Sequence, residues 1–289
     1  MKPSVSSYSF QQYINAGKLT QFSVIGQAAQ LGFSGVEFTD LTPCPHPTQD
    51  DQLAYAAKLR AEAERVGIAI VAYTVGANLY QATPEENAAE VERLMGQVRV
   101  AAALGAPLLR HDACPWGKLP GAVRSFDMML PTIAENARRV SEYAATLGVR
   151  TCTENHGYTC QDSDRVERLF NAVNCPNYGL LVDVGNFACV DEDSALAVSR
   201  LAPYAVHVHV KDFVITPFGT PAEGGFTSRG MNTLRGCAVG EGNIPVERCL
   251  AILARAGYDG WVSIEYEGAE DCIKGIHRGM DHLKKYIGC

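Results

Sequence analysis

The sequence predicts a (β/α)8 barrel in a single domain that spans residues 1–289, and three observations lead to this prediction. Short apolar stretches alternate with longer amphipathic stretches about eight times along the chain. Several amphipathic stretches end on a glycine, and the next apolar stretch begins a few residues later. The length of 289 residues is close to the roughly 250 residues of a typical barrel of this kind, and no linker-like segment divides the chain.

The expected strands lie, in chain order, near residues 4–9, 35–38, 69–73, 107–111, 148–154, 179–183, 205–210 and 262–265. The expected helices between them include residues 52–66, 84–104, 128–147 and 245–256. The glycines that follow helices are Gly32, Gly67, Gly105, Gly148 and Gly257. Parallel strands require crossover helices of this kind. An open doubly wound sheet is the alternative, but it would carry a glycine-rich phosphate turn after the first strand, and residues 6–10 (SSYSF) do not supply one.

The composition argues against several classes of partner. The formal net charge is −7 and no basic stripe is present, so we do not expect a nucleic acid. No run of about 18 apolar residues occurs and the first residues lack the apolar core of an export signal, so we do not expect a membrane. The ten cysteines show no C-x-x-C spacing, which is typical of reduced thiols in a cytoplasmic protein.

Polar side chains gather at the ends of the last four expected strands, and barrels of this type form their active sites at the carboxyl ends of the strands. On the seventh strand, His207, His209 and Lys211 alternate with valines and are expected to point into the barrel. The two histidines lie about 6.6 Å apart at 3.3 Å per residue, so one ion does not take both. His209, nearer the open end, is the expected ligand, and His207 is expected one layer deeper. On the eighth strand, Glu265 lies closest to the strand end, while Glu267 belongs to the following loop.

The candidate ligands of a metal ion are therefore Glu154, Asp183, His209 and Glu265. A single acid at a strand end is most often a helix N-cap or a surface charge, and for Asp183 alone this explanation is as good as a metal ligand. A lone inward histidine is more often a hydrogen-bonded core residue. Several carboxylates that converge inside one barrel mouth would repel each other and lose hydration, and a bound cation removes that cost. Three carboxylates and one imidazole suit Mn²⁺ best, with Mg²⁺, Co²⁺ and Zn²⁺ as alternatives.

Further residues are candidates for contacts with a substrate. His156 shares the inward face of Glu154, and Lys211 shares that of His209. His111 ends the fourth strand, but it is equally well explained as a capped loop residue. Trp116 is a candidate to pack on a sugar face or else to cover the barrel rim. Residues 213–239 form a long connection that contains Arg235, and long loops on this side of a barrel often act as lids or are simply mobile.

Six segments of the sequence together resemble a known family. The segments, in order, are GFSGVEFTD, ENHG, LLVDVGNF, HVHVKD, GEGNIP and GYDGWVSIEYEG. Together they resemble the sugar phosphate isomerase/epimerase superfamily, whose fold is the xylose isomerase-like barrel. The resemblance implies that the Glu, Asp, His and Glu of the ENHG, LLVDVGN, HVHVKD and SIEYEG motifs hold the metal. The alternation of side chains along the strands selects the same four candidates.

The sequence departs from some branches of this superfamily. Ketose 3-epimerases carry a substrate-contacting His three positions after the metal-binding Asp, where this chain has Asn186, and an Arg beyond the metal-binding His, which is missing here. Asn186 is nevertheless placed to contact substrate. Lys211 and Asp212 after the His are similar to the inosose dehydratase and hydroxypyruvate isomerase branches. The His-rich ligand set of the apurinic endonucleases is absent.

The resemblance implies a divalent-metal-dependent isomerase or epimerase that acts on a keto sugar or a related polyol ketone through an enediolate. Glu154 and Glu265 are the expected acid–base residues, because their strands stand at opposite ends of the four-strand arc. A dehydratase of a keto-inositol or 3-keto sugar is the first alternative, and a non-catalytic sugar-binding or accessory subunit is the second. The expected partner is a small carbohydrate, and a homo-oligomer is compatible with the superfamily.

Overall fold

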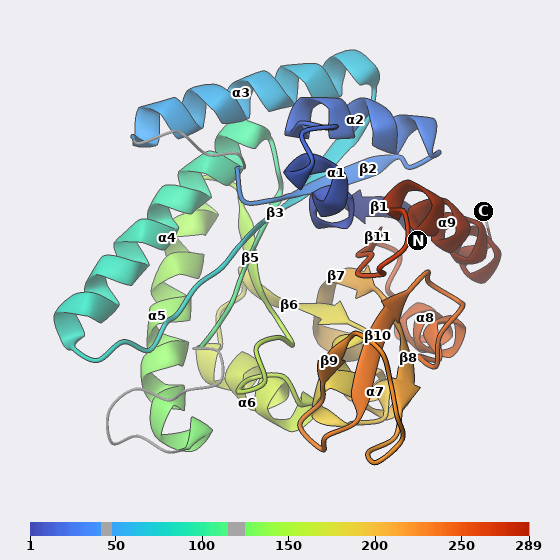
Figure 1. Ribbon diagram of the computed structural model, residues 1–289. Helices are drawn as coiled ribbons and strands as arrows, with labels where there is room; N and C mark the ends of the chain where they lie inside the picture. Colours follow the sequence, from blue (N-terminus) through green and yellow to red (C-terminus); the bar gives the residue numbers. More distant parts are fainter. Residues whose placement is uncertain (42–47, 115–124, 289) are drawn as a thin grey trace.

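The computed structural model describes residues 1–41, 48–114 and 125–288 (Figure 1). Parallel strands form a closed barrel in the order β1-β11-β7-β6-β5-β4-β3-β2, which confirms the predicted (β/α)8 barrel and excludes the open sheet. The barrel strands are β1 (Lys2–Ser6), β2 (Gly35–Thr39), β3 (Ala69–Val75), β4 (Leu108–His111), β5 (Arg150–Glu154), β6 (Tyr178–Asp183), β7 (Ala205–Val210) and β11 (Trp261–Ile264). Each lies within a few residues of its predicted position.

Helices surround the barrel and cover its outer face (Figure 1). They are α1 (Gln11–Asn15), α2 (Gln21–Gln30), α3 (Gln49–Val66), α4 (Pro84–Leu104), α5 (Phe126–Thr146), α6 (Ser163–Val173), α7 (Ser194–Leu201), α8 (Val246–Arg255) and α9 (Cys272–Ile287). α9 packs beside β1, where the chain begins. No helix in the described part of the chain is long and apolar enough to span a lipid bilayer.

Local sequence signals explain where these helices begin and end. At the start of α4, the Thr83 side chain accepts from the backbone N–H of Glu86, and the Glu86 side chain accepts from the N–H of Thr83, which forms a capping box before Pro84. Gly67 and Gly105 end α3 and α4 with φ angles of 82° and 71°, a left-handed conformation that glycine adopts without strain. These signals are local, which is why the sequence predicted α4 with its observed bounds.

The interior of the barrel has an apolar layer at the amino-terminal ends of the strands and a polar layer above it. The apolar layer is a small buried cluster of Val71, Ala72, Leu108, Cys152 and Leu181. Val206 packs against this cluster, although simple alternation predicted that it would face the helices. The pairing of β6 with β7 shifts register between Leu180 and Leu181, and this bulge turns Val206. Val208 and Val210 are fully buried in the main core, as alternation predicts.

The connection after β7 contains a small antiparallel sheet that the sequence did not reveal. Its strands are β8 (Asp212–Thr216), β9 (Phe226–Thr227) and β10 (Thr233–Cys237), in the order β8-β10-β9 (Figure 1). Phe213 on β8 and Leu234 on β10 are buried and attach the sheet to the core. The segment that the sequence identified as a long loop is therefore a built extension of the barrel.

Candidate metal centre

Four side chains from four adjacent strands meet at the carboxyl ends of the barrel strands. Glu154 ends β5, Asp183 ends β6, His209 lies in β7, and Glu265 directly follows β11. Each offers one ligand atom, and these atoms all lie within 4.8 Å of one another. The structure thus brings together the four ligands predicted from the sequence.

The geometry of this group leaves room for a cation. His209 Nδ1 lies 3.7 Å from Glu154 Oε1, 3.9 Å from Asp183 Oδ2 and 3.8 Å from Glu265 Oε2, which is too far for hydrogen bonds. His209 Nδ1 is buried and makes no hydrogen bond, and the buried Asp183 Oδ2 makes none beyond its ion pair with Lys211 Nζ at 3.1 Å. Buried polar atoms normally have partners, and a divalent ion among these four ligands would supply one to His209 Nδ1 and a further one to Asp183 Oδ2. The residues present therefore fit a divalent metal ion.

Glu37 on β2 orients the His209 imidazole. Glu37 Oε1 lies 2.7 Å from His209 Nε2, while its Oε2 lies 2.7 Å from His207 Nε2 and accepts from Ser263 Oγ at 3.1 Å. With Nε2 bound to a carboxylate, Nδ1 is left facing the ligand group, an arrangement common to histidines that bind metals. Burial would raise the pKa of Glu37, but the imidazoles of His209 and His207 outweigh burial and hold it below its usual range. His207 lies one layer below His209, as predicted.

Two buried cations border the ligand group. Lys211 Nζ contacts Glu265 Oε2 and lies 3.1 Å from Asp183 Oδ2 and 3.0 Å from Glu267 Oε1. Burial would lower the pKa of Lys211, but these carboxylates raise it well above its usual value, so the ammonium stays charged. Burial, together with the carboxylates of Glu154 and Glu265, raises the pKa of Asp183 to about 6, although Lys211 opposes this shift. Repulsion among the carboxylates thus persists beside Lys211, and a bound divalent cation would relieve it.

Arg110 is the second cation and links the ligand group to a histidine. Its Nη2 contacts Glu154 Oε2 and lies 2.9 Å from Asp112 Oδ1. Asp112 Oδ1 in turn lies 2.7 Å from His156 Nδ1. Burial would raise the pKa of Asp112, but Arg110 and His156 hold it below its usual value. Asp112 therefore stays ionised and fixes the orientation of His156.

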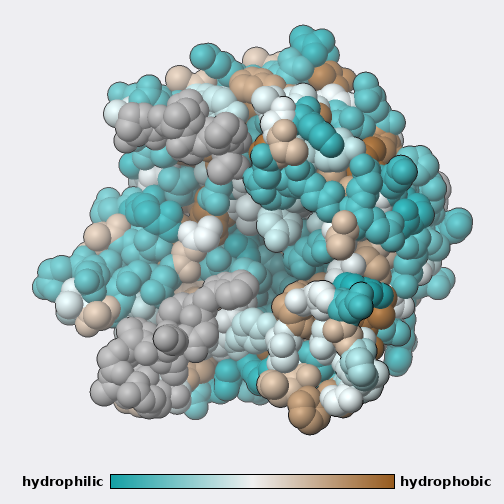
Figure 2. All heavy atoms as spheres, viewed as in Figure 1, coloured by the Kyte–Doolittle hydropathy of each residue, from teal (hydrophilic) through white to brown (hydrophobic). Residues whose placement is uncertain are grey.

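A cavity of about 500 Å³ opens onto the ligand group. Three predicted substrate-contacting residues line it, namely His156, Asn186 and Lys211. Asn186 Nδ2 donates to Glu154 Oε1 at 2.8 Å, so this amide also orients a ligand. The aromatic side chains of Tyr8, Tyr158 and Phe226 complete the outer wall. Figure 2 shows the face of the molecule hollowed near its centre, with mostly hydrophilic residues around the hollow.

The other predicted substrate contacts lie elsewhere. His111 is fully buried outside the cavity lining, with Nδ1 2.9 Å from the Asp112 carbonyl and its ring against Tyr178. Burial lowers the pKa of His111, as for a neutral core histidine. Arg235 lines a neighbouring cavity, and Trp116 lies outside the described residues.

Sequence reasoning assigned no role to Glu37, Asp112 or Tyr8. Glu37 carried a signal, because a glutamate stands in the middle of the apolar strand 35–38. Asp112 follows directly after β4 and could have been found as a further acid at a strand end. Tyr8 carried no signal, since nothing in the local pattern shows that it faces the mouth of the barrel.

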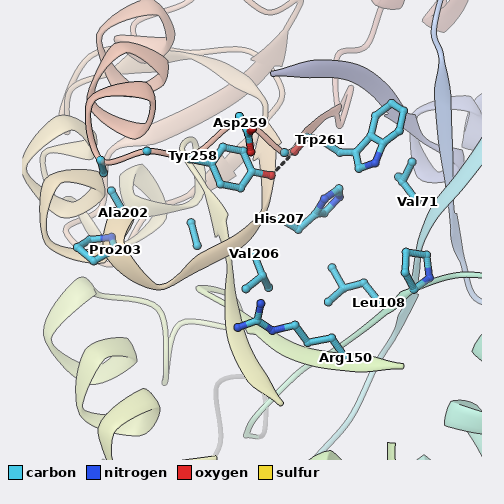
Figure 3. Close-up of a pocket in the computed structure, with 15 residues that line it drawn as sticks. Val71, Leu108, Arg150, Ala202, Pro203, Val206, His207, Tyr258, Asp259 and Trp261 are labelled. Carbon is cyan, nitrogen blue, oxygen red and sulfur yellow. Dashed lines mark hydrogen bonds between the residues drawn. The ribbon is translucent and has the colours of Figure 1, made fainter. Parts of the chain in front are cut away.

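A separate cavity of about 430 Å³ lies at the opposite end of the barrel (Figure 3). Val71, Leu108, Arg150 and Trp261 line it at the amino-terminal parts of their strands, and the Tyr258 hydroxyl donates to the Trp261 carbonyl at 2.5 Å. Two of the four candidate ligands, Glu154 and Glu265, line the other cavity, at the end where barrel enzymes place their active sites.

Comparison with known proteins agrees with this geometry. The family described as xylose isomerase-like TIM barrel matches residues 25–286. The chain belongs to this family. This barrel is 30% identical over 106 residues to a putative hydroxypyruvate isomerase of Streptomyces coelicolor, and the match covers 37% of this chain and 31% of that protein. It is 27% identical over 142 residues to an inosose dehydratase of Yersinia enterocolitica, which covers 47% of each chain. The matches thus span about a third to a half of these relatives.

Among solved structures, the D-psicose 3-epimerase of Clostridium cellulolyticum H10 superposes on this xylose isomerase-like barrel with a TM-score of 0.76. The sequence identity is 18%, and the superposition covers 100% of both chains. At this identity the likeness establishes the shared fold.

Proposed function

We propose that this xylose isomerase-like barrel is a divalent-metal-dependent isomerase or epimerase that acts on a keto sugar or a related polyol ketone. The observation that carries the proposal is the group of Glu154, Asp183, His209 and Glu265, which opens into a cavity large enough for a small molecule. The partial match to a putative hydroxypyruvate isomerase supports the same class of reaction.

The proposed ion is Mn²⁺, held by the three carboxylates and by His209 Nδ1. When bound, it would polarise a substrate carbonyl and the adjacent hydroxyl and so stabilise the negative charge that develops as the carbon between them loses its proton. The proton is taken by a carboxylate of this chain. Glu265 and Glu154 are placed for this role, because both line the cavity from strands that flank β7 and β6.

Residues around the two glutamates have further roles in the proposed reaction. The charged ammonium of Lys211 forms an ion pair with Glu265 and offers hydrogen-bond donors to a substrate oxygen. Asn186 fixes Glu154 Oε1, so the two candidate acid–base residues are held by different partners. In an epimerisation, one glutamate removes the proton from one face of the carbon and the other returns a proton to the opposite face.

A dehydratase of a keto-inositol or 3-keto sugar is the second candidate. The observation that favours it is a pair of proton donors in the cavity, Lys211 and His156, of which His156 is oriented by Asp112. In this reaction the same carboxylate removes the α-proton, the β-hydroxyl leaves with a proton from His156 or Lys211, and the products are an unsaturated ketone and water. The match to an inosose dehydratase supports this alternative.

Proton NMR in D₂O tests both candidates with ketoses, keto-inositols and 3-keto sugars as substrates and Mn²⁺-treated protein. Deuterium at the α-carbon with a new stereoisomer or a moved carbonyl identifies an isomerase or epimerase, and loss of water identifies a dehydratase. Glu265→Gln should abolish either reaction while the fold survives. Glu142→Gln, an exposed change on α5, is the matched control and should leave the rate unchanged. Metal retention by wild type without turnover of any compound would point to a binding subunit.

A further inference from the structure

A second cavity of about 320 Å³ adjoins the cavity at the metal centre. Tyr8, Phe226 and Glu267 line both cavities, so the two cavities are neighbouring compartments that adjoin along these side chains. Each compartment lies within the range of about 300–1,000 Å³ that is typical of small-molecule sites. The proposed reaction uses the compartment at the metal centre, and the outer compartment has no role in it.

The floor of the outer compartment is held by a connected set of hydrogen bonds. Gln12 Nε2 donates to the carbonyls of Gly268 and Glu270 at 3.1 and 2.8 Å, and its Oε1 accepts from the N–H of Cys272 at 3.0 Å. Gly236 of β10 pairs with Gly268, and a side chain at Gly236 would clash with the backbone of the Glu267–Gly268 peptide. The compartment is therefore preformed, which lowers the entropic cost of binding.

The lining of this compartment suits a ring that carries hydroxyl groups. Tyr8 and Phe226 are 39% and 38% exposed and present aromatic surface against which the apolar face of a sugar ring can pack. Arg235 supplies hydrogen-bond donors and Glu267 supplies acceptors. Because Leu234 is buried against the core, its neighbour Arg235 turns to the other side of the small sheet, which is exposed.

We propose that the outer compartment binds the second ring of a glycoside whose keto-bearing first ring lies at the metal centre. The inference rests on the proposed function and narrows its substrate class to two-ring keto-glycosides rather than free monosaccharides. It also assigns a role to the small sheet after β7, since that sheet supplies Phe226 and Arg235. In this arrangement Arg235, which the sequence analysis names as a candidate substrate contact, would contact the second ring.

The test compares the 3-keto derivatives of methyl glucoside and of a glucose disaccharide, with deuterium exchange at the α-carbon as the readout of kcat/KM. Wild type should prefer the two-ring compound by about tenfold, equivalent to about 1.4 kcal/mol. Arg235→Ala removes the donors, and Ala269→Trp fills the compartment from an exposed loop position that lines it. Both variants should lose the preference and keep the wild-type rate on the one-ring compound. Arg255→Ala, an exposed arginine at the end of α8, is the matched control and should retain the preference.

Equal kcat/KM for the two compounds, unchanged in both variants, would overturn the inference and leave the proposed function standing. A higher kcat/KM for a 6-phosphorylated monosaccharide, lost in Arg235→Ala, would also overturn the inference, because the compartment would then be an anion site. Absence of exchange in either compound would refute the proposed function. In that case calorimetry with the unmodified disaccharide and with methyl glucoside still tests the outer compartment as a ring-binding site. Tighter binding of the disaccharide that Ala269→Trp removes would support this site, and equal affinities for the two compounds would reject it.

Discussion

Replacing Glu37 with glutamine tests how the barrel holds His209 at the metal centre. The carboxylate is fully buried and serves the two imidazoles of His207 and His209, each at 2.7 Å, as well as the Ser263 hydroxyl at 3.1 Å. A glutamine has nearly the same shape and keeps one acceptor oxygen, but its nitrogen donates rather than accepts. One imidazole N–H would therefore face another donor in a fully buried site.

The expected size of the effect follows from these contacts. A buried donor that loses its acceptor costs about 1–3 kcal/mol of stability. Loss of the carboxylate behind a metal-binding histidine lowers metal affinity about 10–100-fold. We expect Glu37→Gln to fold, to lose stability in that range, and to bind Mn²⁺ more weakly by that factor.

Two measurements separate the effect on metal binding from the effect on the fold. Mn²⁺ affinity is measured by competition with a fluorescent chelator, and the free energy of unfolding is measured in urea with EDTA present. Ser263→Ala is the matched control, because it leaves both imidazoles with the Glu37 carboxylate as acceptor. It removes the 3.1 Å hydrogen bond to Glu37 together with the contacts of the Ser263 hydroxyl to Ser4 Oγ at 2.7 Å and to His207 Nε2 at 3.2 Å. Its Mn²⁺ affinity should equal that of wild type. If Glu37→Gln lost stability but bound Mn²⁺ as tightly as wild type, Glu37 would support the core and not the metal centre.

The same contacts predict how the stability of the metal-free protein depends on pH. The imidazoles hold the pKa of Glu37 in the folded protein below the value of about 4.3 for an unfolded glutamate. A depressed carboxyl pKa contributes stability that is present above about pH 4.3 and is lost as the pH falls toward the folded pKa. Urea unfolding in EDTA should show a steeper loss of stability below about pH 5 in wild type than in Glu37→Gln. Parallel curves would contradict this assignment.

Three further predictions concern the charges and the metal. Lys211→Met leaves buried carboxylates without their cation, so the metal-free variant should lose about 3–5 kcal/mol in urea unfolding, and Mn²⁺ should restore part of the loss. An unchanged stability would show that the carboxylates are already neutral. Asn186→Ala removes the hydrogen bond to Glu154, so kcat should fall about tenfold with the melting temperature nearly unchanged. A fall in melting temperature with kcat unchanged would assign Asn186 to the fold. Dialysis against EDTA should lower the melting temperature. Mn²⁺ at 100 times its Kd should raise the free energy of unfolding by about 2.7 kcal/mol. An effect of Ca²⁺ equal to that of Mn²⁺ would reject the proposed ion preference.

Much of the barrel could be predicted because its signals are local. The capping box at Thr83 and the glycine at Gly105 set the ends of α4 within the printed sequence around them. The alternation of histidine and valine in β7 shows which side chains face inward once the segment is a strand. The small sheet after β7 escaped prediction, because β9 has only two residues and its pairing with β10 depends on the core beneath it.

The sequence was enough to predict the eight barrel strands in order and the four residues that meet at the carboxyl ends of β5, β6, β7 and β11. Each of these features is encoded by a pattern within a few residues. The tertiary structure alone decided that Glu37 holds His209, that Lys211 bridges three carboxylates, and that Phe226 and Arg235 form an outer compartment. The contact of Glu37 with His209 arises only when the barrel closes, since β1 and β11 separate β2 from β7. The other contacts join residues of different elements, and no local pattern records which of these side chains meet.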